Sequence, residues 1–369
     1  MKILILTRYS RKGASSRLRL FQYLPLFEAA GIRCEPLPLL NDRYLDDVYA
    51  GRRPGIWNIA RCYWTVFRRL LRAKKYDAVI LEKEIFPFLP PLAEAWLGLL
   101  RVPYIVDYDD AIFHNYDLHP NALVRFCLGG KIPYVMRKAA LVVCGNAYLQ
   151  CYAAGAGARN TVIIPTVIDP LRYEAKAGRP AGGDVIRGDT APGDAAAGDV
   201  IIGWIGSPSS VRFLKRLSPV LRDLVDRYPV KLHIIGGGSG IGLGEREEIL
   251  EWTEDRECAL LGALDIGIMP LEDSPWERGK CGYKLIQYMG CGLPVVGSPV
   301  GVNGEIIADG VTGFVAGTGG EWSDRLGELI ADAGLRKVMG AAGRRRMLEK
   351  YSLDTAGKTW LSRLEKIKV

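Results

Sequence analysis

The chain has 369 residues, of which 49% are hydrophobic, and it carries a formal net charge of +8 at pH 7. At about 150 residues per domain the length predicts two domains, and the positive charge favours anionic partners such as nucleotides, phospholipid surfaces or nucleic acid. A transmembrane helix is not expected, because no run of about 18 uninterrupted apolar residues occurs. A zinc cluster is not expected either, because the eight cysteines form no C-x-x-C pair.

In the amino-terminal half, short apolar runs alternate with helical patterns. The run Ile3–Leu6 is too short for the core of a signal peptide and predicts a buried strand, followed by a helix over Leu18–Ala30. Continuous β-branched runs between helices predict a parallel sheet with helices on both faces. Further strands are expected at residues 76–81, 104–107 and 141–144. Several cysteines lie in such runs, which is typical of reduced thiols and predicts a cytoplasmic protein.

This rhythm stops at residues 174–199, a stretch of Gly, Ala, Pro and Asp that predicts a flexible linker. It restarts with strands expected at 200–205, 230–235, 264–269 and 294–296, and with a turn and a short strand within 309–315. The fold class is therefore α/β, with two Rossmann-like halves. We expect a first domain over residues 1–170, a linker over 171–199 and a second domain over 200–350. The last segment, 351–369, contains a helix that is a candidate to pack back on the first domain.

Ligands of open parallel sheets bind beyond the carboxyl ends of the strands, so the loops after the strands hold the candidate site residues. After the first strand, a loop of small residues enters a helix beside an arginine, an arrangement suited to phosphate groups. The alternative is a cationic surface loop. The candidates in this loop are Gly13, Ser15, Ser16 and Arg17.

Three carboxylates lie at the end of another expected strand, in Asp107-Tyr108-Asp109-Asp110. They could suggest a metal site. Because no histidine or cysteine stands nearby at ligand spacing, we prefer acceptor-hydroxyl binding, or structural bonds to backbone amides, and expect no metal. Asp109 and Asp110 are the candidate catalytic residues here. His233 lies inside an expected strand and is expected to be part of the core.

Two loops of the second half are weaker candidates. Ser207 and Ser209 follow the strand at 200–205, and we expect Ser209 or Ser210 to cap the next helix. The amides of that helix could also meet a phosphate. Gly236 and Gly237 follow the next strand and could let the backbone approach a nucleotide base, although a short glycine run is weak evidence.

The strongest segment spans residues 276–289. Gly279 and Gly282 allow close backbone approach, and a helix expected to begin near Tyr283 offers its amino-terminal amides to an anion. Lys280 and Lys284 add positive charge, and Gln287 lies one turn deeper, at a position suited to bind a ribose hydroxyl. The alternative is an ordinary loop with solvated lysines.

Residues 279–315 continue with three ordered motifs: Tyr-Met-x-x-Gly-x-Pro-Val-Val at 288–296, Gly-x-Asn-x-Glu-Ile at 301–306 and Gly-x-x-Gly-Phe at 310–314. This region resembles the donor-binding region of the family-four retaining glycosyltransferases of GT-B fold. The resemblance implies two Rossmann-like domains facing across a cleft, a UDP- or GDP-linked sugar as donor, retention of anomeric configuration, no obligatory metal and no cofactor. It also implies that the departing phosphate accepts the acceptor's proton.

The resemblance further implies that the loop and helix hold the donor, through Gly282, Tyr283, Lys280 and Lys284. Much of the family carries two glutamates eight positions apart here, whereas this chain has Gly279 and Gln287 at those positions. Glu277 could substitute for the first glutamate. The departure leaves two functions open: an active enzyme of polysaccharide or glycolipid biosynthesis with a glycan or lipid-linked acceptor, or an inactive scaffold that binds a nucleotide sugar or forms a complex.

A helix is expected over residues 55–75, with one apolar arc and arginines opposite. Trp and Arg in this arrangement suit an anionic membrane surface, so the protein could be peripheral on the cytoplasmic face of the inner membrane. The alternative, which we prefer, is a core helix packed on the first sheet. Nucleic-acid binding is not expected, because it rests on charge alone. The arc contains Ile56, Trp57, Ala60, Tyr63, Trp64, Phe67, Leu70 and Leu71.

Overall fold

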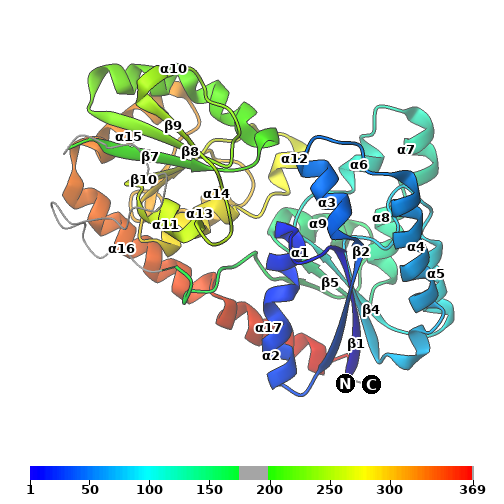
Figure 1. Cartoon of the computed structure of the whole chain (residues 1–369). Helices are drawn as coiled ribbons and strands as arrows, with labels where there is room; N and C mark the ends of the chain where they lie inside the picture. Colours follow the sequence, from blue (N-terminus) through cyan, green and yellow to red (C-terminus); the bar gives the residue numbers. More distant parts are fainter. Residues whose placement is uncertain (174–197, 368–369) are drawn as a thin grey trace. The chain divides into compact units, whose positions relative to one another are not determined.

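The computed structural model describes residues 1–173 and 198–367, so almost all of the expected linker lies outside the described residues. The chain forms two compact units. Unit 1 comprises Met1–Val167, Arg278–Cys281 and Leu353–Val369, and unit 2 comprises Ile168–Glu277 and Gly282–Ser352. Figure 1 shows the elements of both units, coloured along the chain. None of the described helices combines the length and apolar character needed to cross a bilayer.

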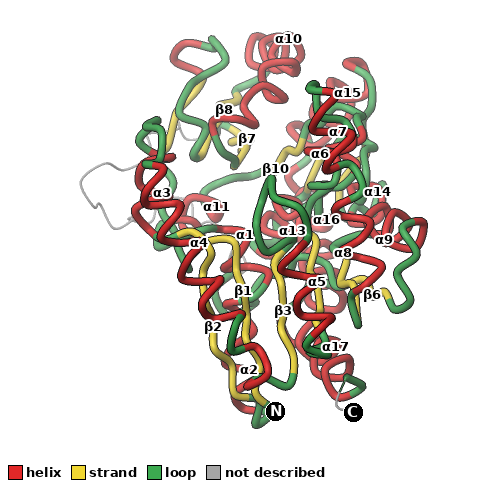
Figure 2. Tube along the Cα trace, turned by 90° about the vertical axis from the view of Figure 1, so that its right-hand side faces the viewer, coloured by secondary structure: helices red, strands yellow, loops and turns green. Residues whose placement is uncertain are grey.

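Unit 1 contains a parallel sheet of six strands in the order β2-β1-β3-β4-β5-β6. Figure 2 shows β1, β2 and β3 running beside one another between helices. Strands β3 and β4 are buried along their whole length, because both faces of the sheet are covered. The strands are β1 (Lys2–Tyr9), β2 (Arg33–Leu40), β3 (Ala78–Glu82), β4 (Tyr104–Tyr108), β5 (Leu141–Cys144) and β6 (Thr161–Ile163).

The second sheet, in unit 2, also has six parallel strands, in the order β12-β11-β10-β7-β8-β9. Its core includes Ile202, Trp204 and Leu232 on the strands, packed against Leu214 and Leu221 of the following helix. The strands are β7 (Val200–Ile205), β8 (Val230–Ile235), β9 (Glu247–Leu250), β10 (Ile266–Met269), β11 (Val295–Gly297) and β12 (Gly313–Val315).

The helices follow the strands in both halves of the chain. The first half contains α1 (Ala14–Arg19), η1 (Phe21–Tyr23), α2 (Leu24–Ala29), α3 (Asp42–Tyr49), α4 (Ile56–Leu70), η2 (Ala73–Lys75), α5 (Leu92–Leu99), α6 (His114–Asp117), α7 (Ala122–Leu128), α8 (Lys131–Lys138) and α9 (Ala147–Gly155). The second half contains η3 (Pro208–Ser210), α10 (Val211–Arg227), η4 (Gly244–Arg246), α11 (Glu257–Gly262), α12 (Pro275–Arg278), α13 (Tyr283–Gly290), α14 (Asn303–Ile306), α15 (Gly319–Ala331), α16 (Ala333–Lys350) and α17 (Leu353–Glu365).

The predicted α/β class with two parallel sheets is confirmed, but three strands and one helix differ from the prediction. Strands β2, β6 and β9 were not expected; β2 contains Pro36 and Pro38, which interrupt the usual strand pattern and are tolerated at a sheet edge. The single helix expected over Leu18–Ala30 is wrong. The chain leaves α1 at Leu20, which has φ −133°, and α2 begins anew with Pro25 in its first turn.

The preferred interpretation of α4 as a core helix packed on the first sheet is confirmed only in part: the helix packs against β2, but most of its apolar arc is not in the core. Only Val66 and Leu70 of this helix are buried, whereas Trp57 is 82% exposed and Trp64 is 59% exposed. The apolar arc therefore faces outward along most of its length. Tyr63 is half-buried, and its ring centre lies 5.0 Å from that of Phe86, so it is one of the few members of the arc with an interior contact.

Each sheet has a topological switch point. This is the place beside its first strand where the chain, after adding strands on one side, continues on the other side. In unit 1 this point lies between β1 and β3, and in unit 2 between β7 and β10. Ligands of open parallel sheets bind at such points, beyond the carboxyl ends of the strands. The loops after β1, β3, β7 and β10 are therefore the first places to search for a site.

Candidate functional site

The switch point of unit 1 is filled by an acid cluster, which we define as Glu82, Asp107, Asp109 and Asp110. Ser15 Oγ lies 2.8 Å from Glu82 Oε1 and 2.7 Å from Asp109 Oδ2, and Ser16 Oγ donates to Glu82 Oε2 at 2.5 Å. The two predicted phosphate-binding serines are thus held by carboxylates through their hydroxyls. These side chains join the loop after β1 to the ends of β3 and β4.

The other two candidates of that loop have structural contacts. A Cβ on Gly13 would lie 2.5 Å from Cβ of Tyr9, so the turn into α1 needs a glycine. Arg17 is buried, and its Nη1 donates to the carbonyl of Arg11 at 3.3 Å. Its guanidinium therefore stabilises the loop itself.

Two cations that sequence reasoning missed neutralise the acid cluster. Arg19 makes a bidentate ion pair with Asp107, at 2.9 Å from Nε and 2.6 Å from Nη2. Lys83 Nζ lies 2.9 Å from Asp109 Oδ1 and 3.7 Å from Asp110 Oδ2. Lys83 has φ +70°, a backbone conformation that a non-glycine residue adopts at a cost and that is concentrated at functional sites. The only signal in the sequence is that Glu82-Lys83-Glu84 directly follows an expected strand.

The acid cluster separates the pKa values of two neighbouring carboxyl groups. Burial and the charge of Asp109 raise the pKa of Asp110. Burial would also raise the pKa of Asp109, but Lys83 and Arg19 outweigh it and hold that pKa below its ordinary value. Carboxyl groups whose pKa values are pushed apart can supply one proton donor and one acceptor. Such a pair can orient a hydroxyl group.

Residues 278–281, from the segment with the strongest sequence signal, belong to unit 1. Asn146 Nδ2 donates to the carbonyls of Gly279 at 3.0 Å and Lys280 at 2.9 Å, and Cys281 Sγ donates to the carbonyl of Asp109 at 2.8 Å. Lys280 is close enough to Asp110 to lower its pKa. The loop is therefore held by Asn146 through its backbone carbonyls and joined to Asp109 through the Cys281 thiol, and its lysine adds a third positive charge beside the acid cluster.

Position 279 has no room for a side chain. A Cβ on Gly279 would lie 2.5 Å from Cβ of Ala111 and 2.7 Å from its amide nitrogen. A glutamate at this position would displace the loop. The absence of the first family glutamate is therefore tied to the packing of unit 1.

Helix α13 of unit 2 begins at Tyr283, as predicted. Its N-cap is Gly282, with φ +62° and no side-chain capping bond, and a Cβ there would lie 2.2 Å from Cδ1 of Ile306. Lys284 Nζ lies 4.6 Å from the centre of the Trp204 ring. A helix amino terminus without a side-chain cap, beside a lysine, is suited to an anion. Lys280 and Lys284 belong to different units.

Gln287 lies in the interior of unit 2. It is 3% exposed, and its Nε2 is 3.3 Å from the hydroxyl of Tyr173, which in turn donates to Glu257. Tyr283 also reaches this group, with its hydroxyl 3.4 Å from that of Tyr173. The amide that was predicted to bind ribose is thus part of an internal hydrogen-bond network.

Glu277 lies at the switch point of unit 2, in the loop region after β10. It is buried, and it accepts hydrogen bonds from Arg212 Nη2 at 3.1 Å and from Ser274. The pair with Arg212 joins this loop to α10, which follows β7. Glu277 therefore has a fixed position within the predicted donor segment.

The loops after β7 and β8 show close backbone packing. Gly236 has φ +74°, and a Cβ there would lie 2.7 Å from the carbonyl oxygen of Gly206; a Cβ on Gly237 would lie 2.6 Å from Cγ2 of Ile234. Ser210 is the N-cap residue of α10, one of the two positions predicted, but its side chain makes no capping bond. Its hydroxyl instead donates to the carbonyl of Ser207 at 2.9 Å.

Comparisons with known proteins point to one family. Residues 200–332 match the family model described as Glycosyl transferases group 1. Over 156 residues the chain is 28% identical to the D-inositol 3-phosphate glycosyltransferase of Corynebacterium jeikeium (strain K411); the match spans 38% of this chain and 37% of that relative's length. All of residues 276–289 lie inside the match to the family model. Within this segment, residues 278–281 belong to unit 1 and the others to unit 2.

Solved structures share the fold along the whole chain. Anabaena Alr3699/HepE in complex with UDP and glucose has a TM-score of 0.69 at 17% identity, covering 99% of this chain and 100% of that one. Sucrose-phosphate synthase from Thermosynechococcus elongatus has a TM-score of 0.72 at 12% identity, covering 100% and 99%. Residues 200–332 are therefore similar in sequence to the glycosyl transferases group 1, and the chain has the two-sheet α/β fold of GT-B glycosyltransferases.

Proposed function

We propose that the protein is a retaining glycosyltransferase that moves a sugar from a UDP- or GDP-linked donor to a glycan or lipid-linked acceptor, in polysaccharide or glycolipid biosynthesis. One observation carries the proposal: the residues that match the family model include α13, whose amino terminus has no side-chain cap and stands beside Lys284. The UDP-bound relative with the same fold supports a nucleotide-sugar donor.

In the proposed reaction, the donor diphosphate binds at the amino terminus of α13. Its negative charge grows as the bond to the sugar breaks, and the helix amides, Lys284 and Lys280 stabilise that charge. The departing diphosphate takes the proton of the acceptor hydroxyl, so no side-chain base is needed. Asp109 and Asp110 orient this hydroxyl through hydrogen bonds. Metal independence is part of the proposal, because Lys83 already neutralises these carboxylates.

A panel of UDP-, GDP- and other nucleotide sugars tests the donor. A ligand that binds the folded chain raises its melting temperature by mass action, so the true donor should raise it most. Transfer and hydrolysis of the same donors are then measured. If none of them shifts the melting temperature, the proposal fails at its first step.

The lysines test the phosphate assignment. We expect Lys280→Ala and Lys284→Ala each to lower kcat/KM by about tenfold, or about 1.4 kcal/mol of transition-state stabilisation. The matched control is Lys337→Ala, an exposed lysine on α16, which should leave kcat/KM unchanged. Unchanged turnover in a folded Lys280/Lys284 double variant would contradict the assignment.

A second candidate function is a non-catalytic subunit that binds a nucleotide sugar. Two observations favour it: position 279 has no room for the family glutamate, and Gln287 is engaged by Tyr173. Transfer and hydrolysis measured with the donors that raise the melting temperature distinguish the two functions. Stabilisation with transfer supports the enzyme, and stabilisation without transfer or hydrolysis supports the subunit.

We also propose that unit 1 docks on the cytoplasmic face of an anionic membrane. The exposed face of α4 carries Trp57 and Trp64 together with the exposed Arg61 and Arg68, and the exposed Arg72 follows the helix. Aromatic side chains enter the interface between headgroups and acyl chains, and arginines pair with anionic lipids.

Vesicle sedimentation tests this docking. Trp57→Ala/Trp64→Ala should weaken binding to phosphatidylglycerol-containing vesicles by about tenfold, or about 1.4 kcal/mol. The control Val338→Ala/Leu348→Ala removes two exposed apolar side chains from α16 and should have no effect. Equal losses in both variants would overturn the docking proposal.

A further inference from the structure

A large cavity lies at the amino-terminal edge of the first sheet, away from the acid cluster. Its volume is about 1440 Å³. Four of its lining residues immediately precede four neighbouring strands: Asp77 precedes β3, Pro103 precedes β4, Ala140 precedes β5 and Asn160 precedes β6. A strand of five residues spans about 17 Å. The cavity is therefore separate from the switch point, which lies at the carboxyl-terminal edge.

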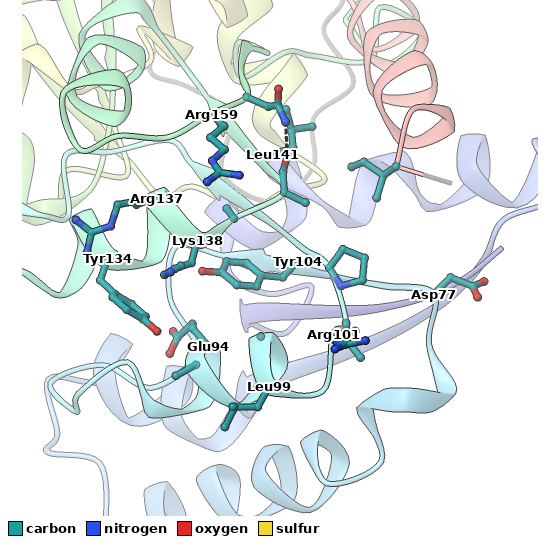
Figure 3. Close-up of a pocket in the computed structure, with 18 of the residues that line it drawn as sticks. Asp77, Glu94, Leu99, Arg101, Tyr104, Tyr134, Arg137, Lys138, Leu141 and Arg159 are labelled. Atoms are coloured by element: carbon teal, nitrogen blue, oxygen red, sulfur yellow. Dashed lines mark hydrogen bonds between the residues drawn. The ribbon is translucent and has the colours of Figure 1, made fainter. Parts of the chain in front are cut away.

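The lining of this cavity is strongly positive. Figure 3 shows Arg101 before β4, Arg137 and Lys138 at the end of α8, and Arg159 before β6, arranged around the pocket. Helix α17 and the residues after it add two further cations. The six cationic lining residues are Arg101, Arg137, Lys138, Arg159, Arg363 and Lys366.

These cations differ from the other clustered cations of unit 1. Arg19, Lys83 and Lys131 all form ion pairs with carboxylates. Among the residues that the structure describes, none of the six head groups in the cavity forms an ion pair with a carboxylate or donates a side-chain hydrogen bond. Like charges in one concavity repel, and its low-dielectric walls focus their field.

The two acidic lining residues do not offset this charge. Asp77 Oδ2 accepts a hydrogen bond from the backbone amide of Lys2 at 2.6 Å, and Glu94 Oε1 accepts one from the amide of Ile85 at 2.9 Å. Burial also raises the pKa of Glu94, which favours its neutral form. The cavity therefore keeps a large excess of positive charge.

We propose that this cavity binds a ligand that carries several phosphate groups. Four of the six cations are arginines, whose planar guanidinium groups bind phosphate oxygens in a bidentate manner. The volume exceeds what a single phosphate fills. The ligand is either free in solution or the headgroup of a lipid. Leu99 lines the cavity and is 77% exposed on α5, beside the exposed Trp96, so a lipid could enter from an apolar surface. This inference goes beyond the proposed transfer reaction.

Calorimetric titration of the full chain with tripolyphosphate tests the proposal, and Arg137→Ala/Lys138→Ala/Arg159→Ala is the test variant. We expect saturable binding that this variant weakens by at least about tenfold. The control variant Lys337→Ala/Arg345→Ala/Lys350→Ala removes the same charge from exposed positions on α16 and should bind as the parent does. Stabilisation by the nucleotide sugar should be unchanged in both variants, which separates this test from that of the proposed function.

A second arm identifies the source of the phosphate. Phosphatidylcholine vesicles that contain phosphatidic acid are added to the tripolyphosphate complex, with pure phosphatidylcholine vesicles as the reference. Displacement by the anionic vesicles alone, lost in the test variant, identifies a lipid headgroup. Tripolyphosphate binding without displacement identifies a soluble ligand. No saturable binding, or equal losses in the test and control variants, would overturn the proposal.

Discussion

At the scale of single residues, the candidate site depends on small groups whose neighbours come from distant segments. Gly279 is the clearest case. Its partner Ala111 lies far away in the sequence, and the two backbones approach so closely that a single Cβ would lie 2.5 Å from the Ala111 methyl group. The sequence shows a glycine in a loop; only packing shows that the glycine is required.

We therefore expect Gly279→Ala to destabilise the folded chain by about 1–3 kcal/mol, the usual cost of forcing extra volume into a packed position. Denaturant unfolding measures the change. The control is Gly304→Ala in α14, where a Cβ would meet nothing within 4 Å; it should be neutral or slightly stabilising. A neutral Gly279→Ala would show that the loop moves freely away from Ala111.

Lys83 is the residue on which the charge balance of the acid cluster depends. Replacing it by Met leaves Asp109 and Asp110, whose side chains are 13% and 32% exposed, without their cation. This should cost about 1–3 kcal/mol of folding free energy, less than the loss of a partner in a fully buried pair. Asp109 has a lowered pKa in the folded chain, so it contributes stability above its ordinary pKa and loses that contribution as pH falls. Lys83→Met should therefore flatten the acid side of the stability curve.

Unfolding free energies from about pH 7 to about pH 3 measure this difference, since the range spans the ordinary pKa of aspartate. Asp109→Asn serves as the second variant, because it removes the titrating group and keeps the shape. It should show the same flattened acid limb. A parent-like pH slope in both variants would contradict the role assigned to Lys83.

The sequence located part of this cluster. Asp109 and Asp110 were candidates because they follow an expected strand in a parallel sheet. Arg19 and Asn146 gave no such signal, because their partners lie 88 or more residues away. Which distant residues form ion pairs depends on the order of the strands in the sheet. No local sequence pattern predicts that order.

At the scale of secondary structure elements, local chemistry predicted α13 well and α4 poorly. Gly282 precedes a largely apolar segment, and this pattern indicated a helix that starts near Tyr283. In the structure Gly282 has a positive φ and is the N-cap of α13. The amphipathic pattern indicates that one face of α4 is apolar. It does not indicate whether the protein core, a partner or a membrane covers that face.

Strand β8 contains a histidine with a testable consequence. His233 is buried, and burial lowers its pKa, an effect that Glu248 at 3.3 Å partly offsets. Lys231 also lowers this pKa, while Asp265 raises it. A base with a lowered pKa in the folded chain binds its proton more readily when unfolded, so stability should fall as pH falls through the ordinary pKa of about 6.5.

His233→Leu keeps an apolar side chain in the core and removes the titration. We expect its unfolding free energy to change less than that of the parent between about pH 7.5 and about pH 5.5, a range that brackets the histidine pKa. His119→Leu is the control, since His119 is only half-buried. A pH slope in His233→Leu that equals the parent's would place the titrating group elsewhere.

At the scale of the whole molecule, both units are built from segments that are not continuous in the sequence. Its last helix, α17, follows unit 2 in sequence but packs in unit 1, where the Trp360 ring lies 6.0 Å from that of Phe27 and 6.2 Å from that of Tyr23. A Cβ on Gly357 would lie 2.6 Å from Cδ1 of Leu26, so the helix approaches α2 closely. Unit 1 is complete only when the carboxyl-terminal segment has been added.

Trp360→Ala should therefore destabilise unit 1 by about 3–5 kcal/mol, the cost of a large core cavity. Hydrogen exchange should show lost protection in β1 and β3, with β7 and β8 unchanged. Trp360→Phe is the control: the buried indole N–H has no partner among the described residues, so its removal forfeits no hydrogen bond. Equal losses of protection in both sheets would contradict this assignment of α17.

Sequence by itself determined the α/β class, most strands of both sheets and the ordered motifs from Gly279 to Val315 that lie within the family match, because these depend on local periodicity and short ordered motifs. Tertiary structure alone decided that residues 278–281 pack in unit 1, that Lys83 and Arg19 neutralise the acid cluster, and that six cations share one cavity. The physical reason is that ion pairs and packing contacts form between residues that are close in space. Where such residues lie far apart along the chain, no local sequence pattern indicates that they are in contact.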